Sequence, residues 1–331
     1  MNTTNISQAD NGTKRQVFHF LQSGSGIVVF AVIFIVGTII TEGAFARPSN
    51  LIEVLLRASV IGIVALGQNL VIFTGGIDLS VGSVFGLGVG IISYCMKNGI
   101  GPELAILYVL LASIACGMVN GLIVSRTKMS PFVITLGMMM IAQSVALTVV
   151  GAGAEDMPEL VNLIRNMMSF IPAGPTLFPL FVWIFAVVII GLFIVFTRFG
   201  PNMFAIGGKE LAAIYSGVNA RQVKFLLYTI CGLCAGIGGI LLCYRIGGAN
   251  PLAGGPYLLM SIAAVVIGGT NIYGGEGNVF NTIIGAITLS ILVNLMNIVQ
   301  INPFIQDIVI GLILIFLVFA LNKLKEIGEG V

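Results

Sequence analysis

The chain has 331 residues, of which 57% are hydrophobic and only 8% are charged, and its mean hydropathy is +1.08. Soluble domains carry about 25% charged residues, so the composition excludes an ordinary soluble protein and predicts an all-α, polytopic integral membrane protein. The net charge is only +2 and no basic stripe interleaves with aromatic residues, so we expect no nucleic-acid partner.

Ten apolar runs, most of them near 20 residues long, are the candidate membrane spans. They cover residues 20–41, 51–73, 81–97, 103–125, 131–150, 177–197, 225–245, 257–269, 278–298 and 304–322. The eighth run has about 13 residues and is shorter than a full span. The polar residues 1–18 form an expected N-terminal tail, and residues 19–331 are expected to form a single transmembrane domain.

The distribution of Lys and Arg predicts how these spans are oriented. With the N-terminus inside, alternate loops place ten of the 15 basic residues in the cytoplasm and five on or near the other side. The ten are Lys14, Arg15, Arg126, Lys128, Arg198, Lys209, Arg221, Lys224, Lys323 and Lys325. An excess of basic residues on the cytoplasmic side is typical of multi-pass membrane proteins, so both termini are expected in the cytoplasm.

The stretch TGGIDLSVGS, residues 74–83, separates the second and third runs. Gly75 and Gly76 are expected to end the second helix, because adjacent glycines destabilise helices and permit unusual backbone angles. Asp78 and Ser80 offer side-chain oxygens where the third helix begins, as N-caps do. Hydrocarbon cannot satisfy the unpaired groups of helix ends, so this interruption should be buried in protein or should line a path for a solute.

A similar pattern occurs near the end of the chain. Residues 75–85 read GG-IDLSV-GSVF, and residues 268–280 read GG-TNIYGGE-GNVF. Glycine-interrupted segments in corresponding positions of two halves of a transporter indicate its substrate path. Coincidence in a glycine-rich chain is the alternative interpretation.

Two connections are longer than a tight loop requires. Residues 151–176 are expected outside and contain Glu155, Asp156 and Glu159, which suits docking of an external partner. Residues 198–224 are expected inside and contain a short segment with the helix-forming residues Glu, Leu and Ala. This composition predicts a short helix in a cytoplasmic loop.

The five cysteines and the single histidine form no recognisable metal or catalytic site. Cys231 and Cys234 form a CxxC pair, but no second pair and no histidine lie nearby, so we interpret them as packing residues rather than as metal or redox groups. His19 lies in the polar lead of the chain. We expect no catalytic residue, no metal and no cofactor, and we do not expect an enzyme.

Three stretches, in order, resemble a known family. They are GGIDLSVGS at 75–83, AIGGKELAAIYSGVNARQVK at 205–224 and IAAVVIGGTNIYGGEGN at 262–278. They are similar to the permease subunit of bacterial ATP-binding-cassette sugar importers, in the ribose, xylose and galactose branch. The resemblance runs from about residue 50 to the C-terminus.

The resemblance implies about ten spans in the cell (inner) membrane, working with a second permease copy that is identical or homologous. It also implies a cytoplasmic ATP-binding-cassette ATPase, an extracytoplasmic sugar-binding protein, a sugar substrate and surrounding membrane lipid. By the resemblance, a helix at 207–217 docks into the ATPase, with a sharp entry at Gly208 and a left-handed end at Gly217. The residues expected there are Gly207, Gly208, Glu210, Ala212, Ala213, Ser216, Gly217 and Arg221.

The sequence departs from the family pattern in three places. Residues 256–261, PYLLMS, lack the acidic residues that relatives usually carry before the IAAVV run. Lys209, Leu211 and Ile214 replace residues that tend to be polar or charged, and Glu276 stands where a basic residue is common. These changes leave open a different small polar solute.

The polar and glycine residues around the two interruptions are the candidate substrate pathway. They are Gln68, Asn69, Thr74, Gly75, Gly76, Asp78, Ser80, Gly268, Gly269 and Asn271. For Gln68 and Asn69 the alternative is hydrogen bonding between helices. For Asp78 the alternative is a plain helix cap.

The chain lacks the phosphate-binding pattern GxxxxGK[ST], so it is not expected to hydrolyse ATP itself. A rival interpretation is an ion-coupled secondary transporter of a small polar solute, which requires paired ionisable groups buried in the membrane. Only Asp78, Asp307 and Glu53 are candidates for that role. A membrane scaffold without transport leaves the two interrupted segments unexplained.

Overall fold

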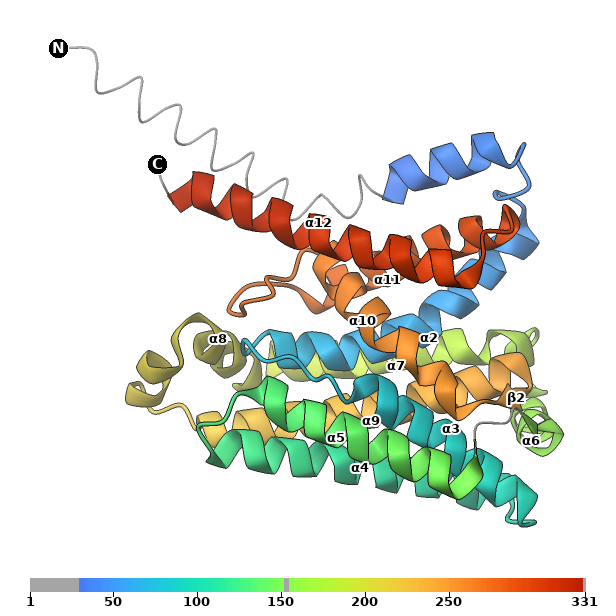
Figure 1. The fold of residues 1–331 in the computed structure, drawn as a ribbon, viewed down its shortest axis with the longest axis horizontal. Helices are drawn as coiled ribbons and strands as arrows, with labels where there is room; N and C mark the ends of the chain where they lie inside the picture. Colours follow the sequence, from blue (N-terminus) through green and yellow to red (C-terminus); the bar gives the residue numbers. More distant parts are fainter. Residues whose placement is uncertain (1–29, 152–154, 330–331) are drawn as a thin grey trace.

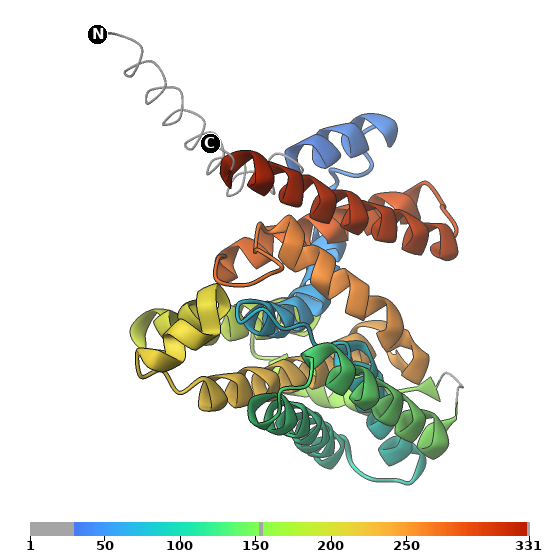
Figure 2. The same cartoon turned by 60° about the vertical axis from the view of Figure 1, so that its left-hand side comes forward.

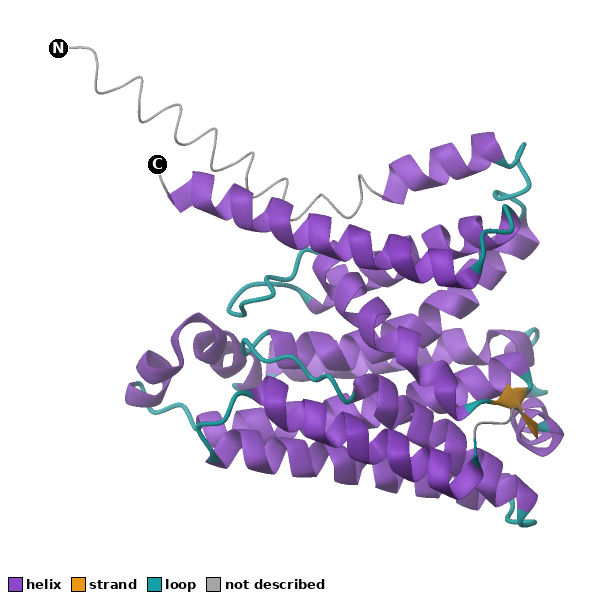
Figure 3. Cartoon of the chain, viewed as in Figure 1, coloured by secondary structure: helices purple, strands orange, loops and turns teal. Residues whose placement is uncertain are grey.

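The computed structural model describes residues 30–151 and 155–329 of the chain, and these are almost entirely helical (Figures 1 and 3). The expected tail at 1–18 and the start of the first apolar run lie outside the described residues. After a helix at Phe30–Ile40, the elements follow in this order: α2 (Pro48–Ile72), α3 (Val81–Lys97), α4 (Pro102–Arg126), α5 (Pro131–Val150), β1 (Glu155–Asp156), α6 (Pro158–Met168), α7 (Gly174–Phe196), α8 (Phe199–Tyr215), α9 (Ala220–Ile246), β2 (Gly248–Ala249), a 3-10 turn (Pro251–Gly254), α10 (Gly255–Ile267), α11 (Val279–Ile298) and α12 (Pro303–Glu329).

Each of the ten predicted runs contains one described apolar helix, and α6 and α8 lie in the two long connections between runs. Six are long and apolar enough to cross a membrane, and four shorter apolar helices occupy the remaining runs. The expected all-α, polytopic membrane fold is therefore confirmed. At 1.5 Å per residue, the 13 residues of α10 extend only about 20 Å, less than a hydrocarbon core of about 30 Å, so α10 is an interrupted span.

The central helices are α2, α9 and α11. In their most apolar stretches, 67%, 67% and 61% of residues are buried, against 28%, 28% and 22% in α4, α5 and α7. A helix that is apolar all round and buried belongs in the interior, whereas the outer helices expose apolar side chains as lipid-facing helices do. Figures 1 and 2 show α8 at one end of the bundle, beside the loops after α2 and α10.

At the opposite end lies the connection expected to dock an external partner. It contains structure that the sequence pattern did not predict: strand β1 pairs antiparallel with β2, with Glu155 opposite Ala249. Helix α6 then begins at Pro158 and buries Leu160 and Ile164. Proline suits the first helical turn because its missing N–H is not needed there.

Small residues allow α4 and α9 to cross closely. A Cβ atom at Gly232 would overlap the Ser113 carbonyl oxygen and approach Gly117, and a Cβ at Gly121 would meet the Phe225 backbone. Lipid gives helices no hydrophobic reason to associate, so backbone proximity through small residues stabilises such crossings. This crossing positions the start of α9, which follows α8 directly.

We predict that Gly232→Ala destabilises the protein by about 1–3 kcal/mol, because the added methyl group forces two backbones apart. Thermal unfolding of the purified full chain measures the effect. The matched control is Gly137→Ala, since a Cβ at Gly137 meets nothing within 4 Å and alanine favours the helix. Equal melting temperatures for the two variants would contradict the assigned crossing.

Candidate functional site

The first break, residues 73–80, begins where α2 ends in a left-handed glycine cap. Gly75 has φ of 75°, and the Gly76 N–H donates to the Val71 carbonyl at 3.3 Å. Gly75 itself donates to Ile72 at 2.8 Å. This is the Schellman arrangement, in which a glycine at positive φ satisfies the last carbonyls of a helix.

The second break, residues 268–278, begins in the same way. Gly269 has φ of 83°, and the Thr270 N–H donates to the Val265 carbonyl at 3.2 Å. Gly268 remains helical with φ of −66°. The predicted correspondence of the two breaks is confirmed, but Gly75 matches Gly269 rather than Gly268. The offset of one residue arises because the cap needs positive φ at a single glycine.

Both breaks lie at the same end of the bundle, and the helices on either side of them run in the same directions (Figure 1). Each break is also buried in protein on at least one side. Gly76 packs against the buried Tyr228, and Gly268 packs against the Asn281 backbone of α11.

Asp78 lies at the centre of a buried polar cluster. Its Oδ1 accepts hydrogen bonds from the Ser80 N–H at 2.9 Å and from the Ser80 Oγ at 2.6 Å. Gln68, in the amide orientation that satisfies both groups, pairs with the Asp78 N–H and carbonyl at 3.2 Å each. The N-cap of α3 is Ser80, without a side-chain cap bond, so Asp78 orders the turn before the helix rather than capping it directly.

Two further helices contact this region through buried polar side chains. Asn120 of α4 donates to the Ser80 Oγ at 2.9 Å. Asn69 of α2 donates to the Thr282 Oγ1 of α11 at 2.6 Å. Gln68, Asn69, Asp78 and Ser80 are all at most 1% exposed. In this state of the chain, their polar groups therefore connect helices.

The loop of the second break is held mainly by its own hydrogen bonds. The Asn271 Oδ1 accepts from the Tyr273 N–H at 3.0 Å, and the Asn271 N–H donates to the Glu276 carbonyl at 3.1 Å. Asn271 thus closes a turn, which is a common use of an asparagine side chain. Thr74, in the first break, bonds locally to the Val71 carbonyl at 2.9 Å.

The helix expected at 207–217 is longer than predicted and breaks at a different residue. α8 begins at Phe199, where the Thr197 Oγ1 accepts the Phe199 N–H at 3.2 Å. Its interruption is at Lys209, with φ of −157° and ψ of 97°, not at Gly208. The expected left-handed end is confirmed, because Gly217 has φ of 87° and the Val218 N–H reaches the Ala213 carbonyl at 3.0 Å.

α8 meets the two breaks through close backbone contacts and through one aromatic pair, in which the ring centroids of Phe204 and Phe73 lie 4.8 Å apart. The Gly275 N–H donates to the Phe73 carbonyl at 3.0 Å. A Cβ at Gly207 would overlap both of these groups, and one at Gly275 would overlap Gly208. We call the four glycines that permit this approach the glycine junction: Gly75, Gly207, Gly274 and Gly275.

The second half of α8, after Lys209, divides into buried and exposed residues. Ala213 is 5% exposed and packs in the core of this chain, so it does not lie on the outer face as its expected docking role required. Ala212 and Ser216 are exposed. The exposed apolar side chains are Leu211, Ile214 and Tyr215. Glu210 pairs with Lys224 of α9 at 2.6 Å, and Arg221 lies in the first turn of α9.

Three residues that contact the first break or its flanking helices were not identified from the sequence. Asn120 was the clearest missed signal, because an isolated amide within an apolar run needs a partner. Thr282 and Tyr228 are ordinary residues in apolar helices, and nothing in the pattern distinguishes them. Among the described residues, no cluster of three or more His, Cys, Asp or Glu side chains is arranged to hold a metal.

We predict that Asp78→Leu destabilises the folded chain by about 1–3 kcal/mol, because the buried Ser80 groups lose their acceptor. Asp78→Asn keeps an acceptor oxygen and should cost much less. Melting temperature and membrane abundance measure the difference. If the leucine variant matches the wild type in both, and in uptake, the cluster does not hold the first break.

Comparison with known proteins identifies the family. A family profile described as "Branched-chain amino acid transport system / permease component" matches residues 50–318. The ribose import permease protein RbsC of Bacillus subtilis (strain 168) is 32% identical over 321 residues, covering 94% of this chain and 97% of RbsC. The D-allose transport system permease protein AlsC of Escherichia coli (strain K12) is 31% identical over 304 residues, covering 91% of each chain.

The galactose/methyl galactoside import permease protein MglC of Salmonella typhimurium (strain LT2) is 32% identical over 328 residues, covering 94% of this chain and 97% of MglC. No solved structure matches the chain. The matched region contains both breaks and α8, so the family predicted from the three sequence stretches is confirmed. The chain is a membrane-spanning permease and belongs to the family of branched-chain amino acid transport system permease components.

Proposed function

We propose that this chain is the permease subunit of a bacterial ATP-binding-cassette importer that carries a sugar or a similar small polar solute. Near full-length relatives are named as ribose, allose and galactose permeases, which favours a sugar over an amino acid. The polar residues at the breaks are mostly uncharged amides and hydroxyls. Such groups suit a neutral polyol, whose recognition depends on hydrogen bonds rather than on fixed charge.

The observation that carries this proposal is the glycine junction. Through it, α8 touches the ends of two interrupted spans by direct backbone contact, and the Phe204 ring of α8 packs on the Phe73 ring beside it. Closely packed elements transmit a displacement rather than absorbing it. A force applied to α8 from outside the membrane would therefore reach both breaks, as an ATP-driven importer requires.

The exposed tip of α8 is the proposed ATPase contact. Leu211, Ile214 and Tyr215 are 65%, 46% and 88% exposed on one short helical segment. An apolar cluster with polar surroundings is typical of a protein interface. Glu210, Ala212 and Ser216 flank this cluster and complete the surface. Gly207, Ala213 and Gly217 act by shaping it rather than by touching the partner.

The remaining parts of the assembly follow from orientation. The end of the bundle that contains α8 carries most of the basic residues of the connecting loops. We therefore place this end and both termini on the cytoplasmic side of the bacterial inner membrane. The opposite end, with α6 and the β1–β2 pair, would face the external sugar-binding protein. A second permease, identical or homologous, would cover part of the exposed apolar surface of the outer helices.

The candidate pathway residues keep that role as part of this proposal. Asn69 and Thr282 link α2 to α11, so a rearrangement of this pair would open the space between the two breaks. The rival ion-coupled mechanism receives little support. Glu53 is exposed and pairs with Arg245 at 3.3 Å, and Asp307 is exposed, so neither is a buried partner for Asp78.

We predict that Gly207→Ala lowers ATP-dependent uptake about tenfold, which corresponds to a displacement costing about 1.4 kcal/mol. The added methyl group separates α8 from Phe73 and Gly275. Vesicles containing the permease, its ATPase and its binding protein provide the assay, with radiolabelled sugar and ATP.

The control for this experiment is Gly208→Ala, because a Cβ at Gly208 meets nothing within 4 Å. Wild-type uptake by both variants would refute the transmission role of the glycine junction. Accumulation of solute by the permease alone, on an ion gradient without ATPase, would refute the importer assignment itself.

We predict that Tyr215→Asp reduces co-purification of the ATPase about tenfold or more, because a buried charge without a partner opposes an apolar contact. Membrane insertion should be unchanged, since the residue lies beyond the spans. Phe170→Asp is the matched control, being 77% exposed at the other end of the bundle. Loss of ATPase in both variants, or in neither, would contradict the proposed contact.

A further inference from the structure

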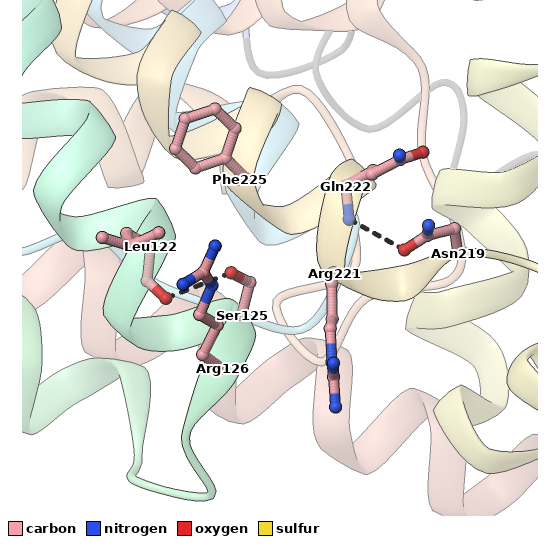
Figure 4. A pocket seen from close by; sticks show the side chains of 7 residues that line it. All are labelled: Leu122, Ser125, Arg126, Asn219, Arg221, Gln222 and Phe225. Atoms are coloured by element: carbon pink, nitrogen blue, oxygen red, sulfur yellow. Dashed lines mark hydrogen bonds between the residues drawn. The ribbon is translucent and has the colours of Figure 1, made fainter.

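A cleft of about 650 Å³ lies between the end of α4 and the start of α9 (Figure 4). Its walls combine two arginines, Arg126 and Arg221, with the apolar side chains of Leu122 and Phe225. It lies beside the exposed tip of α8 but on different helices. Of its lining residues, only Arg221 was among those expected at the ATPase contact, and the proposed contact through the tip of α8 does not use it.

The cleft exists because of where the two helices touch. Gly121 of α4 meets the Phe225 backbone so closely that a Cβ would lie 2.6 Å from its carbonyl oxygen. One turn further along, Ser125 and Arg126 end α4 while Arg221 and Gln222 begin α9. The close crossing thus opens into a wedge at the helix ends.

The wedge is positively charged and contains no carboxylate. No acidic side chain lines it, and the described part of the chain provides no ion pair for Arg126 or Arg221. The 27-residue helix α9 also directs the positive end of its dipole here, which favours an anion. The cleft therefore suits a group with net negative charge, and its lining offers no carboxylate to balance the cation of a zwitterionic ligand.

Apolar surface continues from the cleft along α4. Leu122, Val119 and Met118 are 41%, 44% and 43% exposed, within a helix that is long and apolar enough to cross a membrane. A ligand with an anionic head and a long apolar tail would match both surfaces at once. This combination distinguishes a lipid from the ATPase, whose approach is to the end of the bundle rather than to the side of α4.

We propose that this cleft binds the headgroup of an anionic phospholipid, with an acyl chain along Leu122 and Met118. The guanidinium groups of Arg126 and Arg221 point in different directions in Figure 4, and both side chains are exposed, so binding would turn them toward the phosphate. Basic pockets between spans on the cytoplasmic side are suited to such headgroups. The assignment to the inner leaflet rests on the orientation given in the proposed function, whereas the lipid chemistry does not. A lipid bound in the cleft would also contact the first turn of α9. Only residues 216–219 separate that turn from the end of α8, so the bound lipid would lie close to α8.

The test compares lipids and variants on the purified full chain. Native mass spectrometry would measure retained phosphatidylglycerol and phosphatidylcholine for the wild type, for Arg126→Gln with Arg221→Gln, and for Arg198→Gln. Each basic residue near a membrane surface contributes about fivefold in affinity, so the double variant should bind phosphatidylglycerol about 30-fold more weakly. Arg198 carries the same charge at the same end but does not line the cleft, so its variant should bind like the wild type.

A second variant covers the case in which the double substitution prevents folding. Ser125→Glu leaves both arginines in place and puts a carboxylate into the cleft, where it should displace the phosphate. Phosphatidylglycerol should then raise the melting temperature of the wild type and of Arg198→Gln, but not of Ser125→Glu.

Three outcomes would overturn the proposal. Equal loss of lipid in the double variant and in Arg198→Gln would mean general attraction to surface charge. Equal retention of the two phospholipids by the wild type would mean that the cleft does not select an anion. Unchanged phosphatidylglycerol retention in the double variant would mean that the two arginines do not hold the headgroup.

Discussion

The hydrogen bond between the Gly275 N–H and the Phe73 carbonyl, 3.0 Å long, is the contact on which the rest of the site depends. An interrupted helix leaves backbone groups that lipid cannot satisfy, so a break needs a partner inside the protein. Here the partner of one break is the other break. Glycines make this possible, because a Cβ at Gly207 or Gly274 would occupy the space where the backbones meet.

The two breaks are held in different ways. The first is tied to its surroundings by buried side chains, with Asp78 bonded to Ser80, and Ser80 bonded in turn to Asn120 of α4. The second closes on itself through Asn271 and leaves Tyr273 59% exposed. The first break is thus anchored to α4 by buried side chains, whereas the second is closed within its own loop and meets the first at the Gly275–Phe73 hydrogen bond.

Close packing of small residues organises the molecule beyond this junction. Gly117, Gly121 and Gly232 bring α4 and α9 into backbone contact, and Gly82 and Gly254 do the same for α3 and the turn before α10. In a membrane, such approach replaces the hydrophobic effect as the source of helix association. The same crossing opens the basic cleft at its end, where α9 begins.

The sequence by itself determined the class, the ten helices and the two interrupted spans, because spans need continuous apolar residues and a cap needs glycine at positive φ. It also identified Gly217 as a helix end. Three features could not be predicted from the sequence. They are the break of α8 at Lys209, the burial of Ala213, and the structural equivalence of Gly75 with Gly269 rather than with Gly268. Those outcomes depend on backbone angles and on neighbours distant in the chain. Only the tertiary structure decided that Phe73, Gly207 and Gly275 meet, since a carbonyl carries no signal of its partner in the sequence.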